Sequence, residues 1–251
     1  MKRIIPLAGV QLPASVSLPA ISRTPEGRAM GGIPGWNMFA DPDFRTASTV
    51  RNRAKPNSHI PAQNGSMAMG VMGGKTAWQL ATSTPRFVAN TDMNPNAWSM
   101  FFTVQTPLAG STGGRELLRS LSTDSSTGIA PRLVIRTAGQ LSVLTNDSAD
   151  VRADAVGPIP DNVPFLVMAT FSTRDGVRIF RDGQQLVHNP NDRRPLNSDY
   201  HAGQYVTLRG NSNFVMAAGM HGILDIDLGW PEHAGYRRAI EGFVMGYYGI
   251  G

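Results

Sequence analysis

The residues from Val163 to Val187 read VPFLVMATFSTRDGVRIFRDGQQLV, and this stretch decides the fold of the chain. Three short runs rich in β-branched and aromatic residues are separated by two turns, which contain Asp175-Gly176 and Asp182-Gly183. The Asp-Gly pair supplies the positive φ angles that tight hairpins need. The stretch therefore predicts a three-stranded antiparallel meander.

The first run of this meander has apolar residues on both faces. Side chains alternate along a strand, so Phe165, Val167 and Phe171 share one face. Leu166 and Met168 share the other face. A strand that needs cover on both sides belongs in the middle of a layered sheet. We therefore expect Phe165, Val167 and Phe171 to be buried against an opposing sheet.

Short strand signals recur on both sides of the meander. The clearest is Ala97 to Val104, where alternate apolar residues (Trp98, Met100, Phe102 and Val104) share one face. Further strands are expected at 78–80, 86–88, 117–121, 132–137, 141–144, 204–209, 214–219 and 223–228. Short strands with turn signals between them predict an all-β antiparallel sandwich or jelly roll.

Near the end of the chain the spacing of apolar residues changes from the alternation of a strand to the three- and four-residue steps of a helix, so a short helix is expected there. Pro231 and Glu232 suit the first turn of a helix, because of the fixed φ of proline and the helix dipole. Gly249 can close the helix. Between them, large apolar residues recur at helical spacing, namely Tyr236, Ile240, Phe243 and Tyr247.

Residues 1–70 lack any sustained period and contain many prolines and glycines. They hold eight basic and three acidic residues, and this surplus of five equals the net charge of the chain. We expect an extended N-terminal arm over 1–70 and a sandwich over 71–251. The opening residues resemble a signal peptide, but early prolines interrupt the apolar run, so no signal is expected.

Such an arm cannot build its own core, so its apolar residues are expected to lie on neighbouring chains and its basic residues to help anchor it. The anchoring residues predicted on this basis are Ile4, Ile5, Leu7, Trp36, Phe39, Arg45, Arg51, Arg53 and Lys55. The basic positions have no aromatic residues interleaved with them over 45–55, which disfavours nucleic acid as the partner.

Several classes of site are disfavoured by the composition. There is no cysteine, so disulfides and thiolate metal sites are excluded. No apolar run reaches the ~20 residues of a membrane span. The five histidines show no paired ligand spacing, and no phosphate-binding glycine loop is present. The loop that holds Asn146, Asp147, Asp150 and Asp154 offers oxygen ligands but no fixed ligand spacing. We therefore expect neither a metal nor a cofactor.

Three segments carry a family resemblance. The run Ala169-Thr170-Phe171 and the following GVRIFRDGQ at 176–184 resemble a hairpin of laminin-G-like domains, in the concanavalin A-like lectin/glucanase superfamily. The strand at 97–104 and the segment at 237–250 are similar to the family as well, so the resemblance spans 71–251. It implies a two-sheet antiparallel jelly-roll sandwich with a short C-terminal helix.

The superfamily includes glucanases, whose motif places two glutamates and an aspartate on one strand. The nearest match here is Asp225-Ile226-Asp227, which lacks both glutamates. The glutamates of this chain, at 26, 116, 232 and 241, have no second carboxylate at strand spacing. We therefore expect no catalytic residues and no enzymatic activity, with Asp225 and Asp227 facing solvent.

The resemblance also implies a function, because laminin-G-like folds with a C-terminal helix occur in tailed-phage virion proteins. The first hypothesis is a capsid decoration or minor structural protein of the virion, assembled in the host cytoplasm. Its arm would anchor it to other virion proteins and to copies of itself. The alternative is a glycan-binding adhesin module of a tail or fibre that recognises the host surface. Its candidate contacts are Tyr200, Tyr205 and Trp230.

Overall fold

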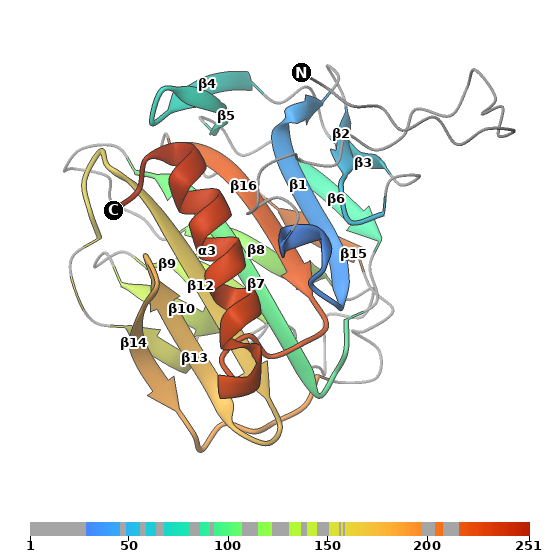
Figure 1. Ribbon diagram of the computed structural model, residues 1–251, viewed down its shortest axis with the longest axis vertical. Coiled ribbons are helices and arrows are strands. Elements are labelled where there is room, and N and C mark those ends of the chain that lie inside the picture. Colours follow the sequence, from blue (N-terminus) through green and yellow to red (C-terminus); the bar gives the residue numbers. More distant parts are fainter. Residues whose placement is uncertain are drawn as a thin grey trace, which may run out of the picture.

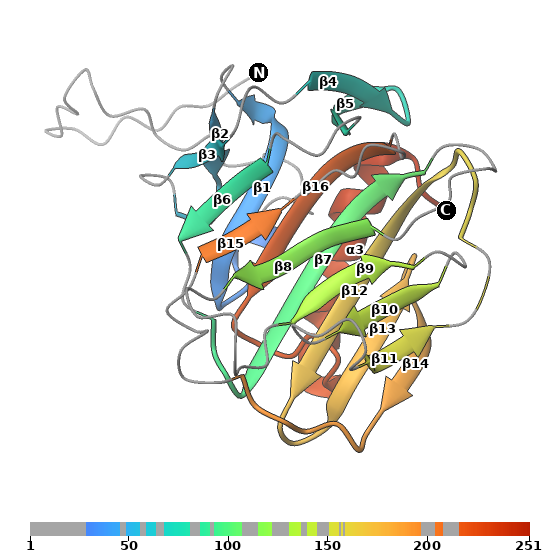
Figure 2. The ribbon, with the colours of Figure 1, turned by 180° about the vertical axis from the view of Figure 1, so that it is seen from behind.

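A computed structural model describes the chain from residue 29 to residue 251. Its description omits residues 46–48, 56–58, 64–67, 81–85, 91–92, 107–114, 122–130, 137–139, 145–150, 156, 158, 197–203 and 208–215. The described residues form two layers of antiparallel strands with the C-terminal helix packed on the outside (Figures 1 and 2). The expected all-β sandwich with a short C-terminal helix is confirmed.

The front layer in Figure 1 carries the helix. Its strands run, in spatial order, β3 (His59–Gln63), β2 (Thr49–Asn52), β1 (Trp36–Arg45), β16 (Met216–Leu224), β7 (Ala97–Gln105), β12 (Pro164–Ser172), β13 (Gly176–Arg181) and β14 (Gln184–Asn189). A hairpin of β4 (Ala68–Met72) and β5 (Lys75–Leu80) pairs with the start of β16.

The back layer is seen in Figure 2. Its strands run, in spatial order, β6 (Arg86–Asn90), β15 (Gln204–Thr207), β8 (Arg115–Leu121), β9 (Arg132–Ile135), β10 (Leu141–Leu144) and β11 (Val151–Ala155). Strand β3 belongs to both layers, because Ile60 pairs with Val50 of β2 while Ala62 pairs with Phe87 of β6. One edge of the sandwich is therefore closed by backbone hydrogen bonds.

The predicted meander is confirmed as β12, β13 and β14. Val167 to Ser172 pair in register with Arg181 to Gly176. Both turns use the conformation that the Asp-Gly pairs predicted: φ is +83° at Gly176, +50° at Asp182 and +79° at Gly183. Asp182 also accepts a hydrogen bond from the backbone N–H of Leu166, which fixes the second turn against β12.

The main core fills the space between the two layers. Phe165, Val167 and Phe171 of β12 are fully buried in it, as expected. The predicted apolar face of β7 lies beside them in the same core (Trp98, Met100, Phe102 and Val104). The back layer contributes the facing side chains, which include Leu117, Leu133, Ile135, Leu141 and Val143. Burial at about 25 cal/mol per Å² of apolar surface makes this core the main source of stability.

A second core lies between the front layer and the C-terminal helix. The 3₁₀ turn η1 (Pro231–His233) leads into α3 (Ala234–Tyr248), and Gly249 ends the helix with a φ of +66°. The predicted helix is therefore confirmed. Its most buried apolar side is Ile240, Val244 and Tyr248, while Tyr236 and Tyr247 lie at its margins. None of the helices that the structure describes is long and apolar enough to cross a membrane.

The predicted boundary at residue 70 is wrong for residues 36–63, which form β1, β2 and β3 of the sandwich. Strand β1 pairs with β16 from Trp36 to Ala40, so it occupies the middle of the front layer. Pro42 of β1 lies where the pairing register with β2 shifts, between Ala40 and Arg45. A proline is tolerated at such a bulge because the residue there does not have to donate a backbone hydrogen bond to the neighbouring strand. Residues 1–28 of the expected arm lie outside the described part of the chain.

The last two predicted strands are one continuous strand, β16. The glycines that indicated a break are places of close approach instead. A Cβ at Gly222 would lie 2.6 Å from the Phe101 ring and 2.7 Å from the Met38 carbonyl oxygen. A Cβ at Gly219 would lie 2.6 Å from the Tyr248 hydroxyl. These glycines let β1 and α3 approach β16.

Candidate functional site

Three aromatic side chains form a stacked row where β16 passes into the helix. Trp230 precedes η1, His233 ends it, and Tyr236 lies in the first turn of α3. The ring centroids of Trp230 and His233 are 5.4 Å apart, and those of His233 and Tyr236 are 5.9 Å apart. A spacing of three residues through a 3₁₀ turn and a helix start places these side chains on one side. We call these three residues the aromatic row.

A cation extends the aromatic row at its Trp230 end. Arg174 is exposed in the turn between β12 and β13, and its guanidinium carbon lies 5.1 Å from the centre of the Trp230 ring. The indole N–H of Trp230 donates a 3.1 Å hydrogen bond to the Ser172 hydroxyl. Two segments distant in sequence therefore meet at this surface.

Tyr236 forms the other end of the aromatic row. It is 37% exposed, which makes it one of the four exposed large hydrophobic residues in the described part of the chain. Its ring contacts that of His233 at an interplanar angle of 31°, and its hydroxyl has no hydrogen-bond partner among the residues that the structure describes. One ring face and one polar tip are thus available to a ligand.

Buried polar groups fix the backbone beneath the aromatic row. The backbone carbonyl of Asp227 bonds Nδ1 of His233 at 2.7 Å, and its carboxylate accepts the backbone N–H of Gly229 at 2.8 Å. Arg178 lies between the Asp175 carboxylate, at 2.5 Å, and the Asp227 carboxylate, at 3.8 Å. The hydrogen bond from Arg178 lowers the pKa of Asp175 below its ordinary value.

The expectation that Asp225 and Asp227 face solvent is wrong for Asp227, which is fully buried. Asp225 is half-buried and accepts the backbone N–H of Asn94 at 2.7 Å. Both carboxylates are thus engaged in holding loops. The reason is that the chain leaves β16 after Leu224, so the alternation of a strand no longer applies to these positions.

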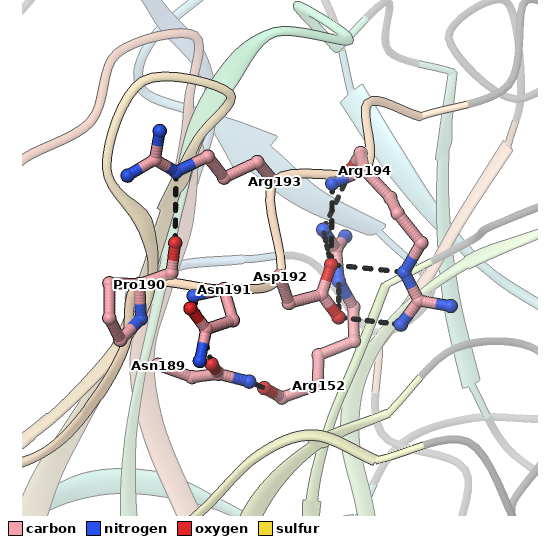
Figure 3. Close-up of polar contacts among 7 residues, drawn as sticks. All are labelled: Arg152, Asn189, Pro190, Asn191, Asp192, Arg193 and Arg194. Atoms are coloured by element: carbon pink, nitrogen blue, oxygen red, sulfur yellow. Dashed lines mark hydrogen bonds and ion pairs between the residues drawn. The ribbon is translucent and has the colours of Figure 1, made fainter.

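A second polar cluster closes the edge of the sandwich opposite β3 (Figure 3). Arg152 of β11 is fully buried, and its guanidinium donates to the Asp192 carboxylate at 3.0 Å and 3.2 Å. Arg194 donates to the same carboxylate. Burial alone would raise the pKa of Asp192, but the hydrogen bonds from Arg194 and Arg152 lower it to about 2.

This cluster joins the two layers. Asn189, at the end of β14, donates from its side chain to the backbone carbonyl of Arg152 at 2.7 Å. The Arg152 guanidinium also lies 4.3 Å from the centre of the Phe171 ring. Arg152 and Asp192 are paired and buried, while Arg194 covers the Asp192 carboxylate from the exposed side, so the cluster holds the two layers together.

An open cleft of about 250 Å³ lies at the far end of β12 from the aromatic row. The β4–β5 hairpin, the end of β7, the loop before β12 and the start of β16 form its walls. It is lined by Gly70, Val71, Gln79, Gln105, Thr106, Asn162, Met216 and Ala217. No charged side chain is among these described lining residues.

The anchoring residues predicted within the described part of the arm make contacts inside the chain. Phe39 is buried, and Trp36 stacks on it with ring centroids 5.2 Å apart. Arg53 pairs with the Asp41 carboxylate at 2.6 Å, and Lys55 donates to the Asn37 side chain. The prediction that these residues anchor a separate arm is therefore wrong, because β1 builds them into the front layer.

The remaining anchoring residues have different outcomes. Arg45 is exposed at the end of β1, and Arg51 is half-buried in β2. Ile4, Ile5 and Leu7 lie outside the described residues.

The three candidate glycan contacts are not brought together by the described residues. Trp230 is in the aromatic row, whereas Tyr205 lies in β15 of the back layer, opposite Ala89. Tyr200 lies outside the described residues. His233, Tyr236 and Arg174 were missed, although the three-residue spacing of 230, 233 and 236 is visible in the sequence.

The loop that offered oxygen ligands is described only at Asp154. That carboxylate accepts a hydrogen bond from the Ser142 hydroxyl and lies 3.7 Å from the Arg136 guanidinium. Asn146, Asp147 and Asp150 lie outside the description. Over the described ranges, no three His, Cys, Asp or Glu side chains gather as a metal site would require.

No family profile matches this chain, and no curated protein matches it. Solved structures do match, at 12–13% sequence identity. A Trypanosoma rangeli sialidase in complex with sialic acid gives a TM-score of 0.61 over 85% of this chain and 34% of its own. The binding domain of botulinum neurotoxin serotype D gives 0.63 over 87% of this chain and 53% of its own.

A third structure concerns botulinum neurotoxin type C, whose cell entry depends on interaction with two ganglioside molecules. It gives a TM-score of 0.61 over 82% of this chain and 51% of its own. This chain thus spans about a third to a half of the chains that it matches. At this identity the likeness shows the fold alone, which is a β-sandwich of the lectin-like kind.

Proposed function

We propose that this chain is a non-enzymatic glycan-binding β-sandwich module and that the aromatic row is its contact surface. The observation that carries the proposal is the open end of the row, where Tyr236 presents a ring face and a hydroxyl without a partner in the described structure. A sugar ring has an apolar C–H face and a rim of hydroxyls. An exposed tyrosine matches both, because its ring is apolar and its tip is polar.

Arg174 adds a second kind of contact. Its guanidinium carries five N–H donors and is exposed beside Trp230. It lies within salt-bridge distance of no carboxylate in the described structure, although after Arg178 its charge also helps to lower the pKa of the neighbouring Asp175. It can therefore donate to sugar hydroxyls or to the carboxylate of an acidic sugar.

The structural neighbours support a glycan as the ligand class. Among the proteins of similar fold, one is a complex with sialic acid and another depends on gangliosides for cell entry. A neurotoxin serotype D domain is also known in complex with N-acetylneuraminic acid, at 12% identity and a TM-score of 0.60. A shared fold does not carry function by itself, so the proposal rests on the aromatic row.

The proposal is tested on an array of neutral and sialylated oligosaccharides, followed by calorimetry with each glycan that binds. Tyr236→Ala and Trp230→Ala are expected to weaken binding about tenfold or more, which corresponds to ~1.4 kcal/mol. Leu186→Ala is the matched control, because Leu186 is 39% exposed and lies on β14. Unchanged affinity in both aromatic variants would refute the proposal.

The non-enzymatic part of the proposal is tested separately. A glycosidase needs two carboxyl groups that flank a scissile bond. Asp225 and Asp227 are each engaged with backbone N–H groups, at Asn94 and Gly229. We expect no cleavage of sialyllactose or of neutral oligosaccharides. Cleavage that is lost in Asp225→Asn would overturn this expectation.

A second proposal is a structural role in a tailed-phage virion, within the concanavalin A-like superfamily that the sequence resembles. It is favoured by residues 1–28, which hold four basic residues, one acidic residue and several large apolar residues. Such a segment suits contact with other virion proteins. Deleting 1–28 should abolish incorporation into particles while the sandwich stays folded. Normal incorporation of the shortened protein would contradict this role.

A further inference from the structure

The open cleft differs chemically from the aromatic row. Its polar side chains are amides and one hydroxyl, namely Gln79, Gln105, Asn162 and Thr106. Amides both donate and accept hydrogen bonds without carrying charge. The two sites lie at opposite ends of β12, because Asn162 precedes this strand and Ser172 ends it. At 3.3 Å per residue, they are roughly 30 Å apart.

One wall of the cleft is held rigid before any ligand arrives. Gln105 donates from Nε2 to the backbone oxygen of Asn162 at 3.1 Å and to its side-chain Oδ1 at 2.9 Å. Asn162 has a φ of +54°, and its backbone N–H donates to the Thr106 carbonyl at 2.9 Å. Thr106 in turn donates from its hydroxyl to the Pro160 carbonyl at 2.8 Å. A left-handed asparagine held by several bonds is a strained, ordered position.

These bonds leave defined groups open. Oε1 of Gln105 and Nδ2 of Asn162 make no hydrogen bond with any group in the described ranges. An acceptor and a donor therefore stand side by side on this wall. Such a pair matches two neighbouring hydroxyls of a sugar, one donating and the other accepting.

The opposite wall comes from the β4–β5 hairpin. Gln79 is exposed on β5, and its amide makes no hydrogen bond with the described residues. Val71 on β4 is 68% exposed, the largest exposure among the big hydrophobic side chains that are described. Gly70 shares a face of the hairpin with Gln79, and a Cβ there would lie 3.2 Å from Cβ of Gln79, whereas Val71 is on the other face. This wall therefore offers a second amide over a position without a side chain.

We propose that this cleft is a second ligand site, for an uncharged polyhydroxyl ligand of one sugar ring. The uncharged lining offers no counterion to a charged ligand, and its amides can exchange hydrogen bonds with neighbouring hydroxyls. A volume of about 250 Å³ lies below the ~300–1,000 Å³ of clefts that hold drug-sized molecules, so the site takes one ring and not a chain. The site is independent of the aromatic row.

The test is a titration of the ¹⁵N-labelled full chain, followed by NMR. The probes are D-glucose, D-galactose and N-acetyl-D-glucosamine, each taken to about 50 mM, well above the ~1 mM dissociation constant of a weak site. At least one probe should shift the side-chain amide signals of Gln79, Gln105 and Asn162. The Trp230 indole signal reports the aromatic row in the same spectra.

Two variants make the assignment specific. Asn162→Gly removes the amide and keeps the positive φ, because glycine adopts it freely. Gln79→Ala removes the other amide from an exposed position. Each should weaken binding about tenfold, while Tyr236→Ala should leave the cleft shifts unchanged.

The outcomes separate the two sites. Absence of shifts at the three cleft amides with every probe would overturn the second site. Shifts that survive both cleft variants would overturn it too. Shifts confined to the Trp230 indole would overturn the cleft assignment and support the aromatic row.

Discussion

Truncating Phe171 to alanine should destabilise the fold severely. Phe171 is fully buried in the core between the layers, and its ring lies 5.5 Å from that of Trp98. Replacing a buried phenylalanine by alanine costs about 3–5 kcal/mol through lost transfer energy and the cavity that remains. The ring also faces the buried Arg152 guanidinium at 4.3 Å, and a desolvated cation–π contact contributes about 2 kcal/mol.

The expected loss is therefore about 5–7 kcal/mol, against a total stability of ~5–15 kcal/mol for a native domain. At about 2–4 °C per kcal/mol for a chain of this size, the melting temperature should fall by roughly 10 °C or more, or the variant should not fold. Circular dichroism melts and denaturant titrations measure this loss.

Two controls sharpen the result. Leu186→Ala, at an exposed position of β14, should stay within about 0.5 kcal/mol of the parent. Phe171→Leu keeps apolar volume but removes the ring beneath Arg152, so it should fall between the parent and Phe171→Ala. A denaturation midpoint for Phe171→Ala equal to that of Leu186→Ala would refute the assignment of β12 as a central, doubly covered strand.

Deleting residues 1–28 should leave a cooperative unfolding transition of the sandwich in circular dichroism melts, whereas deleting 1–60 should abolish it because that deletion removes β1 and β2. A folded 1–60 deletion would contradict the pairing of β1 with β16. Gly183→Val should lower the free energy of unfolding by about 1–3 kcal/mol, because a β-branched residue resists a φ of +79°. A denaturant titration that shows no change would refute this strain. Asp192→Asn should lower the free energy of unfolding by about 3–5 kcal/mol, because it leaves the Arg152 charge buried without its counterion. The folded pKa of Asp192 is about 2, below its ordinary 3.8, so its stabilisation is full above pH 3.8 and is lost as the pH falls through about 2. Denaturation midpoints measured down to pH 2 should show this loss in the parent and not in Asp192→Asn.

The sequence predicted the elements whose signals are local. The meander follows from Asp-Gly turns, β7 from strict alternation, and α3 from helical spacing with a terminal glycine. In each case the decisive residues lie within about fifteen positions of one another. Such patterns can be recognised without knowing how the rest of the chain folds.

Strand β1 was not predictable in this way. Its proline and its lack of alternation are typical of a loop, and what makes it a strand is its pairing with β16, far along the chain. Its attachment also uses side chains, because the backbone N–H of Phe39 donates to Asn52 and the Asn52 amide donates back to the Asn37 carbonyl. Tertiary context here overrides local propensity.

The candidate sites were predicted only in part. Trp230 was predicted as a candidate glycan contact, but Arg174, which lies over its ring, comes from a turn more than fifty residues earlier. The cleft draws its walls from four separate segments, none of which has a motif. Asp227 was expected at the surface because nothing in its neighbourhood reveals that a buried arginine, Arg178, lies beside it.

The pairing of β1 with β16 also orders events during protein synthesis. Trp36 pairs with Leu224, so the earliest described strand lacks its central partner until β16 has left the ribosome. At about 5–20 residues per second, that interval lasts roughly 10–40 s. During this time the apolar residues of β1, Met38 and Phe39 among them, are exposed on a nascent chain. The front layer is therefore completed only after β16 has been synthesised, and chaperones that bind apolar segments have their best opportunity at β1.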